Sequence, residues 1–132
     1  MKNSSASVKR ILVVEDEPGI SAVCQRVLTS EGFEVDIAVN GKVAQDMLGE
    51  KDYDLFLIDV RTPLMNGKQL YQCIQEKHPK LIDRVIFTTG DVMSKDIQGF
   101  LGQAARPFLP KPFTPDELRT IVRETLRQLE NE

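Results

Sequence analysis

Acidic and hydrogen-bonding side chains follow several short apolar segments of this 132-residue chain. Glu15 and Asp16 come directly after "RILVV", Asp59 ends "DLFLID", Thr89 ends "RVIFTT", and Lys111 follows "PFLP". Taken alone, each has an ordinary structural explanation, because acids after a strand often cap the next helix and most lysines lie on the surface. Their recurrence at the ends of apolar segments instead indicates one polar site.

Three carboxylates in one place would repel one another. At about 4 Å and an effective dielectric constant of about 20, each pair costs on the order of 4 kcal/mol. A hard divalent cation such as Mg²⁺ prefers oxygen ligands and usually binds one or two carboxylates, water and a phosphate oxygen. Mg²⁺ and Lys111 together would balance Glu15, Asp16 and Asp59. Such a balanced pocket can accept a dianionic phosphoryl group.

Two kinds of segment that could position these side chains alternate along the chain. Short aliphatic runs bounded by turn residues predict five strands, at residues 10–14, 34–39, 54–59, 84–89 and 107–110. Apolar residues at helical spacing, with Pro18 and Pro115 in first turns, predict helices between and after them. The helical patterns cover residues 20–28, 41–50, 67–78, 93–103 and 118–129.

This alternation predicts a doubly wound α/β fold, in which a five-stranded parallel sheet lies between two layers of helices. We take the strand order 2-1-3-4-5 from known members of this flavodoxin-like fold class and do not derive it. In that order the third strand lies between the first and the fourth. The polar strand ends therefore meet at the carboxyl edge of the sheet, where ligands bind in such folds.

Size and charge limit the classes of function. A chain of 132 residues fits one domain, which we place at residues 9–132 after a polar tail at 1–8. The net charge of −3 argues against a nucleic-acid surface. No signal peptide or membrane span is predicted, and Cys24 and Cys73 fit reduced thiols. We expect a cytoplasmic protein.

Four motifs together resemble the response-regulator receiver domain of two-component signalling, from about residue 10 to 129. They are "VVED", "LIDVRTPLMNG", "TTG" and "LPKPF". The fold implied is that of CheY-like receivers. "TTGD" and "FLPKPF" resemble the receivers of hybrid histidine kinases, so the chain can be a stand-alone regulator or a receiver from a larger protein.

The resemblance implies a role for each site residue. Asp59 would accept a phosphoryl group from a phosphohistidine, and Lys111 would bind Asp59 and then a phosphoryl oxygen. Mg²⁺, or alternatively Mn²⁺, would be bound by Asp59, by Asp16 and by the backbone carbonyl of Arg61. Glu15 would bind the ion directly or through water.

The resemblance also implies a conformational switch. Thr89 would move to hydrogen-bond the phosphoryl group, and Phe108 would then turn inward, which changes the surface of the fourth helix, fifth strand and fifth helix. Phe108 as a plain core residue is the alternative. The Lys111-Pro112 bond is expected to be cis.

Arg61 and Asp91 occupy the second positions after the acceptor and after the switch hydroxyl. In this family such positions tune the lifetime of the phosphoryl group. We hypothesise that their opposite charges pair across the mouth of the site and hinder the attacking water. Two independent surface charges are the alternative, since exposed pairs contribute only about 0–1 kcal/mol.

The partners implied are a histidine kinase or histidine phosphotransfer protein and an output domain or effector, without direct nucleic-acid contact or membrane insertion. A monomer or weak dimer is expected. The protein would catalyse only its own phosphorylation and dephosphorylation. The rival reading is a haloacid-dehalogenase-like phosphatase, whose motif needs a general acid where Arg61 stands. An arginine cannot supply that proton.

Overall fold

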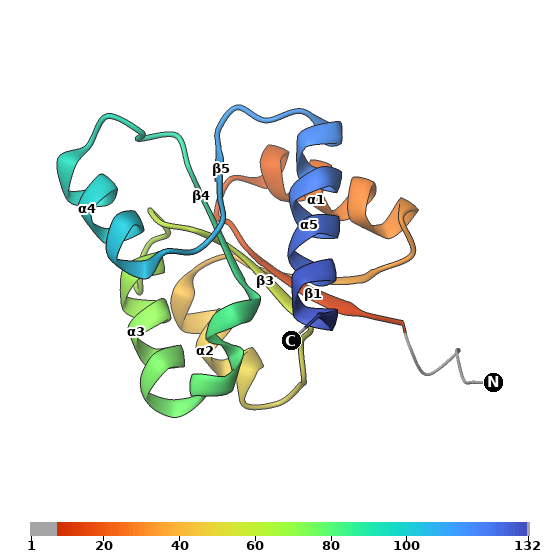
Figure 1. The fold of residues 1–132 in the computed structure, drawn as a ribbon, viewed down its shortest axis with the longest axis horizontal. Coiled ribbons are helices and arrows are strands. Elements are labelled where there is room, and N and C mark those ends of the chain that lie inside the picture. The colour runs from red at the N-terminus through yellow and green to blue at the C-terminus, as the bar shows by residue number, and fades with distance from the viewer. Residues whose placement is uncertain (1–7, 132) are drawn as a thin grey trace.

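The computed structural model describes residues 8–131, in which five parallel strands form one sheet in the order β2-β1-β3-β4-β5 (Figure 1). This confirms the fold class and the strand order expected above. The strands are β1 (Arg10–Val14), β2 (Glu34–Ala38), β3 (Leu55–Asp59), β4 (Val85–Thr89) and β5 (Phe108–Pro110).

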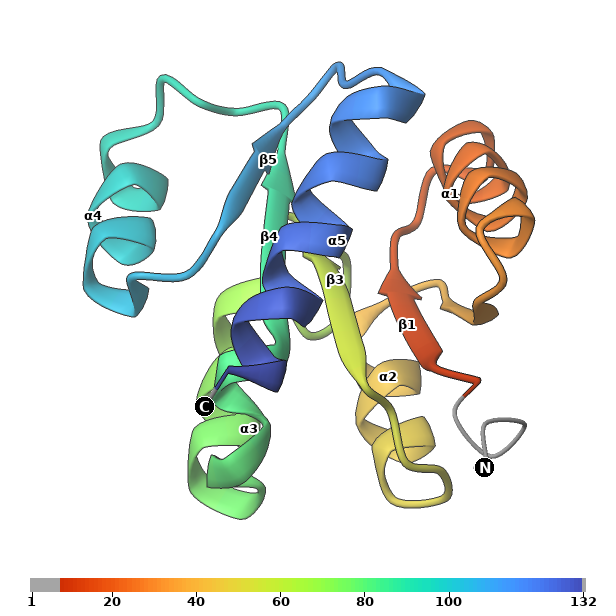
Figure 2. The same ribbon diagram turned by 45° about the vertical axis from the view of Figure 1, so that its right-hand side comes forward.

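Helices cover both faces of the sheet, as the two views in Figure 1 and Figure 2 show. Residues of α1 and α5 share one apolar cluster with the sheet, and residues of α2, α3 and α4 share the other. The helices are α1 (Pro18–Ser30), α2 (Gly41–Leu48), α3 (Gly67–Lys77), α4 (Lys95–Ala104) and α5 (Pro115–Glu130), and a 3₁₀ segment, η2 (Pro79–Arg84), precedes β4.

The central strands β1, β3 and β4 are mostly apolar because both of their faces are buried. In β1, Ile11 and Val13 belong to the cluster under α1 and α5, whereas Leu12 and Val14 belong to the cluster on the other face. All five residues of β3 are buried, Asp59 included. A strand enclosed in this way holds its last side chain in a fixed position, because neither face can shift without opening the core.

The structure differs from the sequence expectations mainly at element ends. The helix expected at 93–103 begins at Lys95, because the Ser94 hydroxyl accepts a hydrogen bond from the Ile97 N–H at 3.3 Å and caps it. The 3₁₀ turns of η2 were not expected. Of the tail placed at residues 1–8, only Val8 lies within the described residues, and it is exposed. None of the described helices has the length and apolar composition needed to cross a membrane.

Gly67 offers a test of how tightly the chain after β3 is packed. A Cβ atom there would lie 2.7 Å from Val60 Cα and 2.8 Å from the Asp59 carbonyl oxygen. We expect Gly67→Ala to lower the free energy of unfolding by about 1–3 kcal/mol, the usual cost of overpacking. Chemical denaturation measures this change.

Gly99 in α4 is the matched control, because a Cβ atom there would meet nothing within 4 Å. Gly99→Ala should raise stability by about 0.5–1 kcal/mol through helix propensity. Equal changes in the free energy of unfolding for the two substitutions would show that the chain around Gly67 has room for a Cβ atom.

Candidate functional site

The pairing of the strands brings the predicted site residues to one edge of the sheet. Asp59 at the end of β3 lies opposite Thr88 of β4, and Thr89 lies opposite Pro110 of β5. The backbone N–H of Lys111 donates to the Thr89 carbonyl at 2.9 Å, so the residue after β5 continues the sheet for one more hydrogen bond. The Lys111 side chain therefore starts beside the carboxyl ends of β3 and β4.

The ammonium group of Lys111 lies among three carboxylates. Its Nζ atom is 2.7 Å from Glu15 Oε1, 2.8 Å from Asp59 Oδ2 and 3.3 Å from Glu17 Oε1. The side chains of Glu15 and Asp59 are 3% and 6% exposed, and that of Lys111 is 10% exposed. Glu15, Asp59 and Lys111 thus meet as the sequence predicted.

Glu17 is the member of this cluster that the sequence reasoning missed. It follows the predicted acidic pair and precedes Pro18, where an acid is equally expected to begin a helix. The run of three acids at residues 15–17 was the available signal. The direction of each side chain decides which acids join, and that direction depends on the loop between β1 and α1.

Asp16 lies apart from the cluster. Its side chain is exposed, and in the described chain the group of three carboxylates that lie within 4.8 Å of one another consists of Glu15, Glu17 and Asp59. The role of Asp16 as a metal ligand stays a prediction. The second oxygen of Glu15 accepts the Glu17 backbone N–H at 3.1 Å, which fixes the turn that separates these acids.

Thr89 is buried at the end of β4, and its hydroxyl accepts the backbone N–H of Asp91 at 3.0 Å. The Arg61 backbone N–H donates to Asp59 Oδ1 at 3.0 Å, so both oxygens of Asp59 have partners.

The Arg61 side chain forms an ion pair with Asp91, as hypothesised from the sequence. Both side chains of this pair are exposed, which leaves its effect on the phosphoryl lifetime a prediction.

Phe108 is half-buried on β5 and packs against the core on the α2, α3 and α4 face. This position fits both the switch role and the plain core role, so the choice stays open. The Lys111-Pro112 peptide bond is cis, as expected from the sequence.

Burial and pairing act against each other in this site. Burial raises the pKa of Glu15 above its ordinary value, and the hydrogen bond from Lys111 offsets only part of that effect. Burial alone would lower the pKa of Lys111, but its hydrogen bonds to Asp59 and Glu15 outweigh burial and raise it. Lys111 therefore remains charged throughout the physiological pH range.

The donor set fits a magnesium ion. Glu15, Glu17 and Asp59 offer carboxylate oxygens that lie within 4.8 Å of one another, and such hard oxygen donors are the ligands that Mg²⁺ takes in proteins. One ammonium group against three carboxylates leaves two negative charges. A divalent cation would neutralise them.

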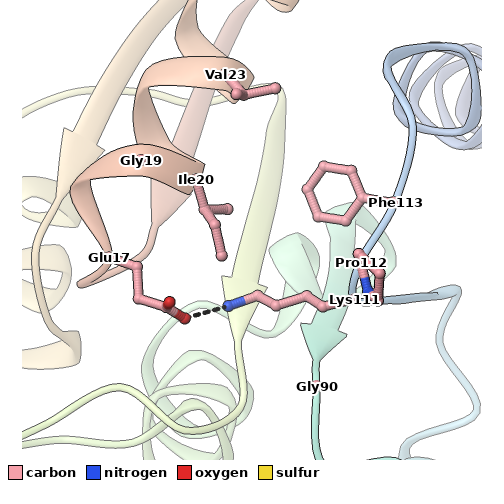
Figure 3. A pocket seen from close by; sticks show the side chains of 8 residues that line it. All are labelled: Glu17, Gly19, Ile20, Val23, Gly90, Lys111, Pro112 and Phe113. Carbon is pink, nitrogen blue, oxygen red and sulfur yellow. Dashed lines mark hydrogen bonds and ion pairs between the residues drawn. The ribbon is translucent and has the colours of Figure 1, made fainter.

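An apolar pocket of about 420 Å³ adjoins the site (Figure 3). Ile20 and Val23 of α1 line one side, and Pro112 and Phe113 line the other. The pocket ends at Lys111, so the acidic cluster is flanked by a surface on which apolar side chains of another molecule can pack.

Comparison with known proteins agrees with this geometry. A family model described as the response regulator receiver domain matches residues 11–123. The response regulator Rre1 of Synechocystis is 38% identical over 118 residues, and the response regulator ArlR of Staphylococcus epidermidis is 33% identical over 118 residues. These alignments cover 88% and 89% of this chain but only 51% and 52% of the relatives. The chain thus spans about half the length of these relatives.

Solved receiver domains have the same fold. A CheY-like receiver domain protein from Methanospirillum hungatei is 28% identical with a TM-score of 0.85, and the match covers 95% of this chain and 98% of that one. The receiver domain of a sensor histidine kinase from Pseudomonas aeruginosa is also 28% identical, with a TM-score of 0.81 and coverage of 92% and 99%. That structure has a magnesium ion coordinated in its active site cleft.

The role of Lys111 in stability is testable by Lys111→Met. The substitution leaves Glu15 and Asp59 buried without their cation, and breaking a buried pair costs about 3–5 kcal/mol. Loss of the ammonium should raise the pKa of Glu15 further, because burial already raises it. The loss of stability should therefore be largest near neutral pH and should shrink as pH falls through the carboxyl range.

Urea unfolding of Lys111→Met at several pH values, with a chelator present, measures this dependence. Lys42→Met is the control, since Lys42 is exposed and its loss should change stability by less than about 0.5 kcal/mol. A deficit in Lys111→Met that stays constant with pH would mean that the buried carboxylates are not its cause.

Proposed function

This chain belongs to the family of response regulator receiver domains, and we propose that Asp59 accepts a phosphoryl group from a phosphohistidine of a partner protein. The observation that carries the proposal is the contact between Asp59 and Lys111. The carboxylate is buried at the end of β3, and its Oδ2 atom lies 2.8 Å from Lys111 Nζ.

The transfer moves the phosphoryl group from nitrogen to oxygen. A carboxylate oxygen of Asp59 attacks phosphorus as the P–N bond breaks, and the bonding electron pair returns to the imidazole nitrogen of the donor. Lys111 stabilises charge on a phosphoryl oxygen without transferring a proton. Asp59 becomes an acyl phosphate, which water later hydrolyses to regenerate the carboxylate and release phosphate.

Glu15, Asp59 and the predicted ligands Asp16 and the Arg61 carbonyl would hold Mg²⁺. When bound, the ion supplies further positive charge to the phosphoryl oxygens. Of these residues, Glu15 and Asp59 lie together in the described carboxylate cluster, which supports the site, whereas Asp16 is exposed and outside that cluster. Asp59 and Lys111 then have separate tasks, since the first bonds to phosphorus and the second compensates the charge that arrives with it.

Phosphorylation would bias two conformations of the domain. The Thr89 hydroxyl now accepts the Asp91 N–H, and it would move to donate to a phosphoryl oxygen. Phe108 would then turn inward and change the surface of α4, β5 and α5. Phe108 is half-buried and packs against the core beside α4, which is compatible with this part of the proposal.

A histidine kinase or histidine phosphotransfer protein is the proposed donor, and an output domain or effector is the proposed target. The apolar pocket between α1 and the segment after β5 is where we place the donor, because it ends at Lys111. Relatives that are about twice as long make an attached output domain one form of the target.

Cytoplasmic location and a monomer or weak dimer remain part of the proposal. The free thiols of Cys24 and Cys73 support a reducing compartment.

We propose no turnover of a separate substrate. In the phosphatase alternative, a general acid would stand two residues after the nucleophile, but Arg61 stands there and pairs with Asp91. The protein would therefore catalyse only its own phosphorylation and dephosphorylation.

Phosphorylation is tested by incubation with acetyl phosphate and Mg²⁺ followed by intact-mass measurement. The native chain should gain one phosphoryl group, and Asp59→Ala should gain none. Asp46→Ala is the control, because Asp46 is an exposed aspartate on α2 and its loss should leave phosphorylation unchanged. Phosphorylation that persists in Asp59→Ala, or that is indifferent to removal of Mg²⁺, would refute the proposal.

The pair of Arg61 and Asp91 is tested by the decay of the phosphorylated protein. Arg61→Ala and Asp91→Ala should each shorten its half-life by about two- to fivefold, the range that an exposed ion pair spans. The double variant should decay no faster than the faster single variant, because the two side chains act as one barrier to water. Unchanged half-lives in both single variants would refute the hypothesis.

A further inference from the structure

Three carboxylates surround the Lys111 ammonium group in this structure: Asp59 and Glu17 accept hydrogen bonds from it, and Glu15 forms an ion pair with it. A lysine ammonium has three N–H donors and no acceptor, and three carboxylates lie within reach of this one. A phosphoryl oxygen that arrives beside Asp59 therefore meets an ammonium group that already has three carboxylate neighbours. To bind Lys111 Nζ directly, this oxygen has to replace one of the three carboxylates.

Glu17 is the carboxylate that can leave most easily. Its contact with Lys111 is the longest of the three, 3.3 Å against 2.7 Å for Glu15 and 2.8 Å for Asp59. Its side chain is 60% exposed, so water can solvate the carboxylate as soon as the contact breaks. The buried carboxylate of Glu15 has no such alternative, and Asp59 stays beside Lys111 as the residue that carries the phosphoryl group.

The local backbone gives Glu17 a second place to go. It is the N-cap residue of α1, yet its side chain makes no capping hydrogen bond within the described chain. Instead it reaches across one end of the pocket to Lys111 (Figure 3). Pro18 has no N–H group, and the Ile20 N–H donates to the Glu17 carbonyl. The Gly19 N–H in the first turn of α1 is therefore the group that a released carboxylate can approach.

We propose that Glu17 is a positioning residue that holds the phosphoryl-binding donor of Lys111 in the unphosphorylated protein and is displaced by the incoming phosphoryl oxygen. The inference rests on the proposed function of Asp59 and adds a residue to it. Glu17 does not touch the phosphoryl group, and it acts only through Lys111. Its negative charge opposes binding of the dianion until it leaves.

Two substitutions separate the contact from the charge. Glu17→Gln removes the charge. Glu17→Asp keeps the charge, but its side chain is one methylene shorter and is a preferred N-cap, so it should turn back to α1. The probe is beryllofluoride, a phosphoryl analogue, measured by ¹⁹F NMR titration at saturating Mg²⁺. Both variants should bind it about two- to fivefold more tightly than the native chain, the range expected for release of one exposed ion pair.

Glu50→Gln is the matched control, since it removes one exposed acid from the turn after α2 and should leave the affinity unchanged. Glu17→Asp should also raise the melting temperature through the new cap. Tighter binding is a readout that mere damage to the loop cannot produce.

Tighter binding in Glu17→Gln alone would show a charge effect and overturn the displacement. Weaker binding, or a higher Mg²⁺ requirement in both variants, would make Glu17 a metal ligand and overturn it as well. Native affinity in both variants would show that Glu17 does not limit access to Lys111. Failure of the native chain itself to bind beryllofluoride would instead count against the proposed function of Asp59.

Discussion

The site depends on one ammonium group in the middle of several carboxylates. Lys111 lies within 2.8 Å of both buried acids, and without it Glu15 and Asp59 would be charges in the protein interior with no compensation. The same ammonium supplies a positive charge at the place where a phosphoryl group would bind. Stability of the resting protein and affinity for the phosphoryl group therefore depend on the same ammonium group.

The rest of the fold holds that ammonium and its partners in place. Burial of β3 on both faces fixes Asp59, and the register of β4 with β5 places Lys111 one residue beyond the sheet. Gly67 lets α3 begin against the end of β3, where no side chain has room. Around this rigid edge the loops are more exposed, and they hold the two contacts most open to change: the ion pair of Arg61 and Asp91, and the reach of Glu17 to Lys111.

Much of this arrangement could be predicted from the sequence, because strand patterns and strand-end polar residues are local signals. The five strands, their order in the known fold class, and the meeting of Asp59 with Lys111 follow from them. What could not be predicted depends on side-chain direction in a loop. Three consecutive acids look equivalent in the sequence, but the turn after β1 points Glu15 and Glu17 toward Lys111 and leaves Asp16 exposed. The 3₁₀ turns of η2 were missed because apolar spacing does not mark so short a segment.

A double-mutant cycle between Lys111 and Asp59 in the free energy of unfolding tests most directly whether this ammonium compensates the buried acceptor. The cycle compares the native chain, Lys111→Met, Asp59→Asn and the double variant, all in the presence of a chelator. Direct compensation across 2.8 Å predicts a coupling energy of about 1–3 kcal/mol, so that the neutral asparagine recovers part of the stability lost with the lysine. Additive effects, within about 0.5 kcal/mol, would contradict the account, because the two side chains would then contribute independently to the fold.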